Sequence, residues 1–256
     1  MRILAVDAGN SRIKWGLRED QEWLLLGATN HAEIDSLAEK WKTLPAPHKI
    51  IVSNVAGEKS HAHLQKLFSI WPAHCEWVSA KSIECGVSNG YDDPAQLGSD
   101  RWAALIAAWD LRHAACLVVN AGTAMTVDGL NDKGEFLGGV IVPGFSAMRQ
   151  ALAQSTAASS LRQVTQDKIS VTRAEDFKAF CTNSADAAHN GCLLALTGAV
   201  ERMWELLQHH SAENPYCILS GGDAFALQPL LSMPVQVVEH LVLDGLIKIV
   251  QQEETP

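Results

Sequence analysis

An aspartate and a lysine flank the first glycine turn of the chain. A short apolar run ends in Asp7, the turn Gly9-Asn10-Ser11 follows, and a second run contains Lys14. Glycine lets a backbone approach a phosphate closely, and neighbouring N–H and hydroxyl groups can donate to its oxygens. A strand-end carboxylate can hold hydrated Mg²⁺, and a lysine adds a point charge for a β- or γ-phosphate. The pattern indicates a phosphate-binding hairpin.

Two later turns repeat this arrangement of a strand followed by glycine. Asn120-Ala121-Gly122-Thr123-Ala124 follows one apolar run, and Ser220-Gly221-Gly222-Asp223 follows another. Each turn alone is weak evidence, because most glycine turns are purely structural. Two related hairpins and a Gly-Gly turn ahead of a helix are a more specific set, and together they favour a nucleotide site.

The two hairpins also resemble each other in sequence. Residues 6–17 placed over residues 119–130 without a gap are identical at five positions: Val6, Ala8, Gly9, Gly16 and Leu17 match Val119, Ala121, Gly122, Gly129 and Leu130. The offset of 113 is close to half of the 256 residues. An internal duplication is the economical explanation, and a chance likeness of two hairpins is the alternative.

The apolar patterns predict strands and helices that alternate in both halves. Strands are expected at 3–6, 13–17, 23–26, 49–53, 77–79, 116–119, 125–127, 135–142 and 216–219. Helices are expected at 34–41, 61–68, 99–113, 145–152, 185–209, 224–231 and 239–251, with Ser99 as the N-cap of the third. Residues 155–172 are small and polar, and are expected to form an exposed excursion.

Composition limits the classes of function. A length of 256 residues allows one large domain or two small ones, and a net charge of −9 disfavours nucleic-acid binding. No run approaches the roughly 18 apolar residues that cross a bilayer, and the first apolar run is too short for a secretion signal. The six cysteines form no Cys-x-x-Cys pair. These features predict a cytoplasmic protein with no membrane or nucleic-acid partner.

The set of three turns resembles the nucleotide-binding layout of the actin and sugar-kinase superfamily. Further segments look like type III pantothenate kinase, in order from residue 3 to about residue 250. They are Asp7-x-Gly9-Asn10-Ser11-x-x-Lys14, residues 89–102 with Gly98-x-Asp100-Arg101, Gly122-Thr123-Ala124-x-Thr126-x-Asp128, residues 138–144 and Gly221-Gly222-Asp223-Ala224. The segment containing Asp100 and Arg101 is the most discriminating.

The resemblance implies an α/β fold made of two duplicated ribonuclease H-like, actin-like ATPase halves, with mixed sheets flanked by helices. Residues 1–114 would carry the first phosphate hairpin and the pantothenate motif. Residues 115–256 would carry the second hairpin and the adenosine turn. The implied reaction is ATP-dependent phosphorylation of pantothenate to 4′-phosphopantothenate, the first step of coenzyme A biosynthesis.

The resemblance also implies roles for particular residues. Asp100 would be the general base, and a helix N-terminus is expected to keep its pKa low. ATP and its phosphates would bind at Asp7, Ala8, Gly9, Asn10, Ser11, Arg12, Ile13, Lys14, Thr123, Gly221 and Gly222. Pantothenate would bind at Tyr91, Gly98, Ser99, Asp100, Arg101 and Ser184, with Thr182 as the alternative to Ser184. Asp7 would hold Mg²⁺, through water.

One position departs from the family pattern. Asn120 stands where the family usually has an aspartate associated with a monovalent cation, K⁺ or NH₄⁺, and an amide has no charge to offer it. A homodimer is implied as well, with the Ser184 position contacting the partner's pocket. Two alternatives stay open: a nucleotide-binding regulatory protein that assists transcription, and a phosphotransferase or phosphatase with another substrate.

Overall fold

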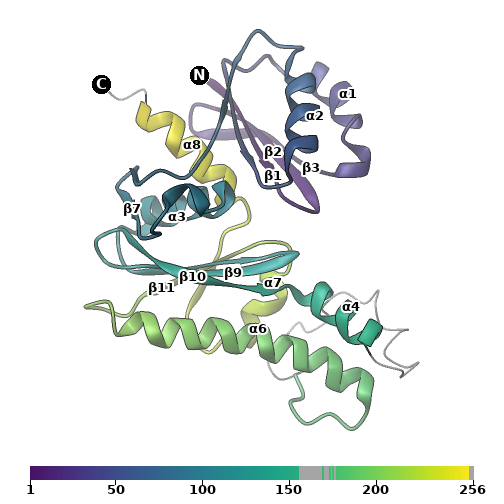
Figure 1. The fold of residues 1–256 in the computed structure, drawn as a ribbon, viewed down its shortest axis with the longest axis vertical. Helices are drawn as coiled ribbons and strands as arrows, with labels where there is room; N and C mark the ends of the chain where they lie inside the picture. Colours follow the sequence, from purple (N-terminus) through teal and green to yellow (C-terminus); the bar gives the residue numbers. More distant parts are fainter. Residues whose placement is uncertain (156–168, 170–172, 174, 176, 254–256) are drawn as a thin grey trace. The chain divides into compact units, whose positions relative to one another are not determined.

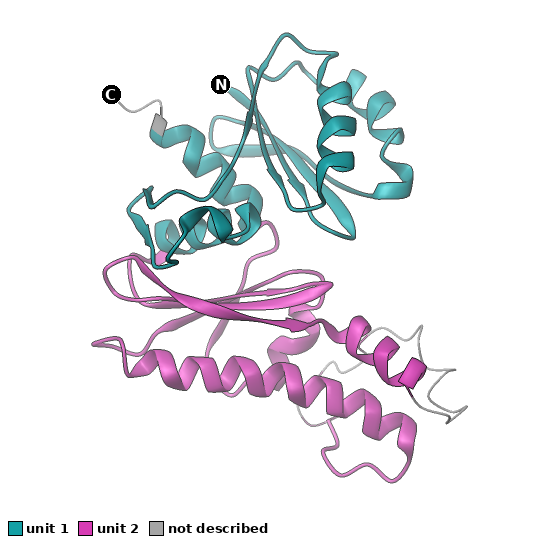
Figure 2. Ribbon diagram, viewed as in Figure 1, with its two compact units in different colours: residues 1–111, 241–256 teal, residues 112–240 magenta. Residues whose placement is uncertain are grey.

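The chain forms two compact units, which Figure 2 colours separately. The structure is a computed structural model that describes residues 1–155, 169, 173, 175 and 177–253. Unit 1 comprises Met1–Leu111 and Leu241–Pro256, and unit 2 comprises Arg112–His240. Within the described residues, no helix is both long and apolar enough to cross a membrane.

Unit 1 is built on a mixed sheet whose strands lie in the order β3-β2-β1-β4-β5. Its strands are β1 (Arg2–Ala8), β2 (Arg12–Glu19), β3 (Glu22–Asn30), β4 (Lys49–Asn54) and β5 (His74–Trp77), with the antiparallel pair β6 (Ile83–Glu84) and β7 (Val87–Asn89) later in the chain. Its helices are α1 (Ser36–Lys42), α2 (Glu58–Phe68), α3 (Ser99–Arg112) and α8 (Leu241–Glu253), and the 3₁₀ turns are η1 (His31–Glu33) and η2 (Pro94–Gln96).

Alternation along the strands separates the two faces of this sheet. Leu4, Val6 and Ala8 of β1 pack in one core with Trp41 of α1 and Leu64 of α2. Successive strand residues point to opposite faces, so Asp7 lies on the other face, where α8 packs against β1 and β4. Figure 1 shows α1 and α2 on one side of this sheet and α8 on the other.

The five strands of unit 2 repeat this plan in the order β10-β9-β8-β11-β12, within a sheet that has seven strands in all. Its strands are β8 (Cys116–Ala121), β9 (Ala124–Leu130), β10 (Glu135–Pro143), β11 (Tyr216–Ser220) and β12 (Val235–Val237). Its helices are α4 (Phe145–Ser155), α6 (Ser184–Gln208) and α7 (Ala224–Leu227), followed by the 3₁₀ turn η4 (Gln228–Leu230). In Figure 1, α6 runs along one face of the sheet, where its buried residues join a core with β8, β9 and β11.

The two units agree in the directions of their paired strands as well as in the order of those strands. In unit 1, β1 pairs antiparallel with β2 and parallel with β4, and β4 pairs parallel with β5. In unit 2, β8 pairs antiparallel with β9 and parallel with β11, and β11 pairs parallel with β12. β3 pairs antiparallel with β2, and β10 pairs antiparallel with β9, and each of these two pairings contains a register shift. This agreement supports the predicted duplication.

The register corrects one detail of the predicted repeat. Ala8 pairs with Ile13 in the first hairpin, whereas Ala121 pairs with Met125 in the second, so the second turn is one residue shorter. The ungapped identities of Gly16 with Gly129 and of Leu17 with Leu130 are therefore not structural equivalences. The equivalences of Val6, Ala8 and Gly9 precede the turn, and they hold.

The end of the chain also differs from expectation, because α8 groups with unit 1 although it follows the last strand of unit 2. A Cβ on Gly245 would lie 1.8 Å from the carbonyl oxygen of Ala103, so the backbone of α8 lies directly on α3. Asp244 accepts a hydrogen bond from Trp23 Nε1 at 3.1 Å. The excursion expected at 155–172 falls almost wholly outside the described residues.

Candidate active site

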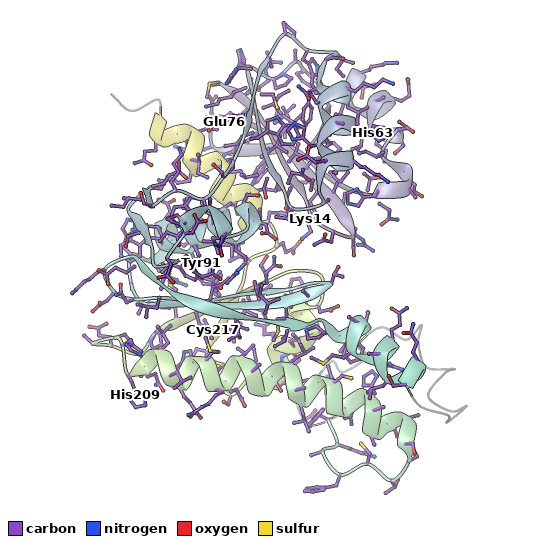
Figure 3. The ribbon with its side chains drawn as sticks, viewed as in Figure 1. Lys14, His63, Glu76, Tyr91, His209 and Cys217 are labelled. Carbon is purple, nitrogen blue, oxygen red and sulfur yellow. The ribbon has the colours of Figure 1, made fainter. Side chains whose placement is uncertain are left out.

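Three polar side chains share the end of one sheet face in unit 1. In the strand pairing, Asp7 of β1 lies opposite Lys14 of β2 on one side and Ser53 of β4 on the other. Because facing residues in paired strands project to the same side, all three lie on the face that α8 covers. The hydrophobic run Ile50–Val52 positions Ser53 at the end of its strand. Figure 3 labels Lys14 on β2.

The start of α3 is bound to this same edge. Ser99 is the first residue of α3, and its hydroxyl lies 2.9 Å from that of Ser53 in a buried contact. Ser99 therefore acts as a buried link to the sheet rather than as the predicted N-cap. The link places Asp100, the next residue, within electrostatic reach of Asp7.

Asp7 is a buried carboxylate with unsatisfied hydrogen-bonding capacity. Burial, followed by the nearby charge of Asp100, raises the pKa of Asp7 to about 7, although Lys14 lowers it. Its Oδ1 atom is buried and has no hydrogen-bond partner among the described residues. A buried acceptor without a donor is costly, so this atom is suited to a ligand.

The expectation of a low pKa for Asp100 is wrong. Burial raises the pKa of Asp100 and outweighs the opposing effects of the backbone N–H groups and of the Arg101 charge. The N–H of Arg101 donates to Asp100 Oδ1 at 2.8 Å, so the helix start acts as predicted. The sequence could not show the desolvation, which depends on how α3 packs in unit 1. A raised pKa makes Asp100 a stronger base than an exposed aspartate.

Gly98 is needed for the position of the Asp100 carboxylate. A Cβ on residue 98 would lie 2.6 Å from Asp100 Oδ1, inside the closest approach of real atoms. The carbonyl of Gly98 accepts the first helical hydrogen bond, from the N–H of Trp102 at 2.9 Å. Trp102 is fully buried and its Nε1 donates to Glu84 at 2.7 Å, which anchors the helix start from within.

Arg101 and Tyr91 form a second contact beside the helix start. Arg101 is buried, its Nη1 donates to the Tyr91 hydroxyl at 3.0 Å, and its guanidinium lies 5.7 Å from the ring centroid. The loop that carries Tyr91 is held by its own side chains, since Asn89 accepts from the N–H of Tyr91 and Asp93 from the N–H of Ala95. Figure 3 labels Tyr91 in this loop.

The turn of the first hairpin presents mainly backbone groups. Asn10 and Ser11 are exposed, whereas Ala8 and Ile13 are fully buried in the core. Ala8 and Ile13 can therefore contribute only backbone atoms to a phosphate site. Arg12 is exposed at the start of β2.

Unit 2 brings its own predicted residues together. Asn120 pairs with Ser220 of β11, and the N–H of Asp223 donates to the carbonyl of Ala121 at 3.1 Å. Gly221 has a φ of 101°, and a Cβ there would lie 2.2 Å from the Ala121 oxygen. The Gly221-Gly222 turn thus lies directly against the end of β8, next to the hairpin that carries Thr123. Thr123 and Gly222 are exposed, and Asn120 is half-buried.

Ser184 is the exposed first residue of α6, and it is not among the residues that the contacts of unit 2 described above bring together. The N-cap is Asn183, whose side chain accepts from the N–H of Asp186 at 2.9 Å. Thr182 precedes the helix and is also exposed.

The cluster of Asp7, Lys14 and Ser53 is better suited to a divalent ion that arrives with a nucleotide than to a metal held by the protein alone. Among the described residues, no group of three or more His, Cys, Asp or Glu side chains could hold a metal. Magnesium commonly uses one or two carboxylates together with substrate phosphates and water. The buried and unsatisfied Oδ1 of Asp7 could supply one such carboxylate oxygen.

Two polar residues near these clusters were missed. Ser53 could have been suspected as the first polar residue after the apolar run Ile50–Val52, but its partner Ser99 is 46 residues away in sequence. Asp223 belongs to the motif Gly221-Gly222-Asp223-Ala224, but the sequence predicts no separate role for it. It is half-buried beside the Gly221-Gly222 turn, and burial raises its pKa.

The fold and the two glycine hairpins define the class of protein, an actin-like ATPase fold shared with sugar kinases. A glucokinase from an Antarctic psychrotroph shares the fold with a TM-score of 0.52 and 10% identity, covering 98% of this chain and 99% of that one. A Campylobacter jejuni protein described as a Baf family transcriptional activator has a TM-score of 0.61 and 21% identity, covering 99% and 100%. At these identities the likeness shows the fold alone.

The chain belongs to the type III pantothenate kinase family. The sequence model of that family matches residues 3–206. The type III pantothenate kinase of Nitrosospira multiformis is 44% identical over 250 residues, covering 98% of this chain and 91% of the relative. That of Nitrosomonas eutropha is 42% identical over 247 residues, covering 95% and 92%. The predicted family and its phosphotransferase class are confirmed, and the regulatory alternative is not favoured.

Proposed function

We propose that this chain transfers the γ-phosphate of ATP to the primary hydroxyl of pantothenate, with Asp100 as the general base. The observation that carries this proposal is the geometry around Asp100. Its carboxylate has a raised pKa, and the Ser99–Ser53 contact links it to the sheet edge that bears Asp7 and Lys14. The acceptor is inferred from family membership, with relatives at 42–44% identity over nearly the whole chain.

In the proposed reaction, Asp100 accepts the hydroxyl proton while the hydroxyl oxygen bonds to the γ-phosphorus. The bond from that phosphorus to the bridging oxygen breaks, and ADP leaves with the electron pair. Phosphoryl transfer has a loose transition state, so positioning and charge count for more than base strength. When bound with the nucleotide, magnesium would neutralise charge on the phosphates. Asp7 would hold the ion through Oδ1, and Lys14 would face the β- or γ-phosphate.

The residues around the helix start would recognise pantothenate. The Arg101 guanidinium is buried, and its hydrogen bond to the Tyr91 hydroxyl fixes its orientation. The guanidinium could then pair with the carboxylate of pantothenate. Gly98 leaves space for the Asp100 carboxylate, and Ser99 fixes its position. In unit 2, Thr123 would contact phosphate, and the Gly221-Gly222 turn would contact adenosine.

A release assay for ADP tests the acceptor. Purified protein with ATP and Mg²⁺ should release ADP only when pantothenate is added, and phosphopantothenate should form in equal amount. Other small hydroxylated acceptors supplied at the same concentration should give little ADP. ADP release that is independent of pantothenate, or equal with another acceptor, would contradict the proposal.

The substitution Asp100→Asn tests the base. It should lower kcat by about 10²- to 10⁴-fold because the amide cannot accept the proton, while ATP still binds. Asp92→Asn is the matched control, since Asp92 is an exposed aspartate in the same segment. If D100N turned over as fast as D92N, the assigned base would be wrong.

We infer further that the protein is a homodimer in which Ser184 contacts the partner's pantothenate. Ser184 is exposed on the first turn of α6, which is compatible with such a contact. Sedimentation should give twice the mass of one chain, and Ser184→Ala should raise KM for pantothenate more than Thr182→Ala does. A monomeric enzyme with full activity would contradict this inference.

A monovalent cation, K⁺ or NH₄⁺, is proposed to bind only weakly in unit 2. Asn120 offers one amide oxygen and no negative charge at the relevant strand end, so replacement of potassium by sodium should change the rate little.

A further inference from the structure

In each unit, the residue that follows the third strand bonds to the glycine turn of the hairpin. In unit 1, His31 Nε2 lies 2.7 Å from the carbonyl oxygen of Gly9. In unit 2, the backbone N–H of Gly144 donates to the carbonyl oxygen of Thr123 at 3.0 Å. His31 follows β3, and Gly144 follows β10.

The strand registers make His31 and Gly144 equivalent. The N–H of Gly9 donates to the Arg12 carbonyl, and the N–H of Gly122 donates to the Ala124 carbonyl, so these two acceptors correspond. Arg12 pairs with Asn30, and Ala124 pairs with Pro143. The residues after Asn30 and Pro143 are His31 and Gly144. Two halves of different sequence thus bond to the turn from the same position.

The bond in unit 1 fixes a particular N–H group. A carbonyl oxygen only accepts, so the ring nitrogen of His31 donates, as the neutral Nε2–H tautomer or as the imidazolium. The Gly9 carbonyl and the Asn10 N–H belong to one planar trans peptide and point in opposite directions. Holding the carbonyl toward His31 therefore directs the Asn10 N–H away from it. Asn10 is exposed, and its N–H is one of the phosphate donors predicted for this turn.

We propose that His31 is a positioning residue for the nucleotide: it sets the orientation of the Asn10 N–H toward a phosphate. This inference rests on one part of the proposed function, the binding of a nucleotide phosphate at the first hairpin. It does not require that pantothenate be the acceptor of the phosphate. Gly9 then has both backbone groups bonded, its N–H to Arg12 and its carbonyl to His31. The peptide that presents the donor is ordered before the ligand arrives, which reduces the entropy cost of binding.

The two units achieve this contact by different means. In unit 2 the backbone itself touches the turn, and a Cβ on Gly144 would lie 2.0 Å from the Gly122 oxygen. In unit 1 a side chain spans the gap, so the contact can be removed without altering the backbone. His31 is therefore the member of the pair that a substitution can test.

The test compares three variants of the full-length protein. His31→Ala removes the donor, and His31→Gln keeps an N–H donor at the end of a side chain of similar reach. His48→Ala is the matched control, because His48 Nδ1 accepts from the N–H of Arg2 at 3.0 Å, at the opposite end of β1. Direct binding of Mg·ATP is measured by calorimetry, and KM is measured for ATP and for pantothenate.

Loss of one hydrogen bond should weaken Mg·ATP binding by about three- to tenfold in H31A. KM for ATP should rise by a similar factor while KM for pantothenate stays constant. H31Q should recover most of the affinity, and H48A should bind like the wild type. A role confined to folding would instead change both KM values, or would affect H31A and H48A alike.

Unchanged Mg·ATP affinity in H31A, or equal losses in H31A and H31Q, would overturn the inference. If H31A did not fold, His31→Asn, whose shorter side chain falls short of Gly9, would take its place beside H31Q. Should ADP release prove independent of pantothenate while H31A still binds Mg·ATP weakly, the proposed acceptor would fail and the role of His31 would stand.

Discussion

The two hairpins pair their strands in the same way, but the first strand ends in a carboxylate in one and in a neutral amide in the other. The first ends β1 in Asp7, a buried carboxylate with a pKa of about 7 that faces Lys14 across the strand pair. The second ends β8 in Asn120, which is neutral and faces Thr126. Both turns donate an N–H to the strand that follows. The two turns therefore share a backbone hydrogen bond, whereas an acidic residue stands at the end of the first strand in only one of them.

Removing the charge from the first hairpin should have the largest effect. Asp7→Asn should lower kcat by at least about 100-fold, because the amide is a poor ligand for a metal bound to phosphate. Rates measured across Mg²⁺ concentrations should show that excess metal does not restore the wild-type value. Asp92→Asn provides the exposed control, and wild-type turnover in D7N would show that the charge of the first hairpin has no role in the reaction.

The same variant should be more stable than the wild type in alkaline buffer. Asp7 has an ordinary pKa of 3.8 and a folded value of about 7, so its burial costs nothing below about pH 4. The cost grows between those values and is complete above about pH 7. Without Mg²⁺ near pH 8, D7N should unfold at a higher urea concentration than the wild type, with a free energy of unfolding larger by up to about 4 kcal/mol. Near pH 4 the two proteins should have the same free energy of unfolding. Equal stability at both pH values would contradict the raised pKa.

A smaller effect is expected from the turn contact in unit 2. Gly144→Ala places a Cβ 2.0 Å from the Gly122 oxygen, so the turn must move. Mg·ATP affinity should fall by more than the three- to tenfold expected for H31A, since backbone must shift rather than one side-chain bond be lost. Gly198→Ala is the control, because its Cβ would meet nothing within 4 Å. A G144A protein that bound Mg·ATP normally would separate the two turns functionally.

The smallest change should come from restoring a charge to the second hairpin. Asn120→Asp should create a preference for potassium over sodium, with a rate difference of a few fold, since a carboxylate binds cations better than an amide. Asn214→Asp adds the same charge at an exposed position of unit 2 and should leave the rates equal. Equal rates in both salts for N120D would show that charge alone does not define a cation site there.

The sequence predicted the hairpins because strand alternation and glycine turns are local signals. Residues such as Asp7, Gly9 and Lys14 lie within one hairpin, and their chemistry can be inferred from spacing. The one-residue difference between the turns was missed, because an ungapped alignment gave identities at Gly16 and Leu17 that the register does not support. Register depends on hydrogen bonding between strands, which the letters do not contain.

Features that depend on tertiary packing were beyond prediction. The raised pKa of Asp100 results from burial that helix position alone does not reveal. The bond from His31 to Gly9 joins residues 22 apart, and the contact of Ser53 with Ser99 joins residues 46 apart. The family resemblance supplied roles for Asp100 and Arg101, but it gave no indication of Ser53 or His31.

The packing of α8 has a consequence for synthesis of the chain. Unit 2 is one continuous segment, whereas unit 1 is completed by Leu241–Pro256. On the ribosome, β1 and β4 emerge early, yet the helix that packs on the Asp7 face of the sheet is translated after the whole of unit 2. Unit 2 can therefore finish folding first, while the sheet edge of unit 1 that carries Asp7 is completed only when residues 241–253 emerge. A ribosome that stops before residue 241 releases a protein with a complete second half and an uncovered first half.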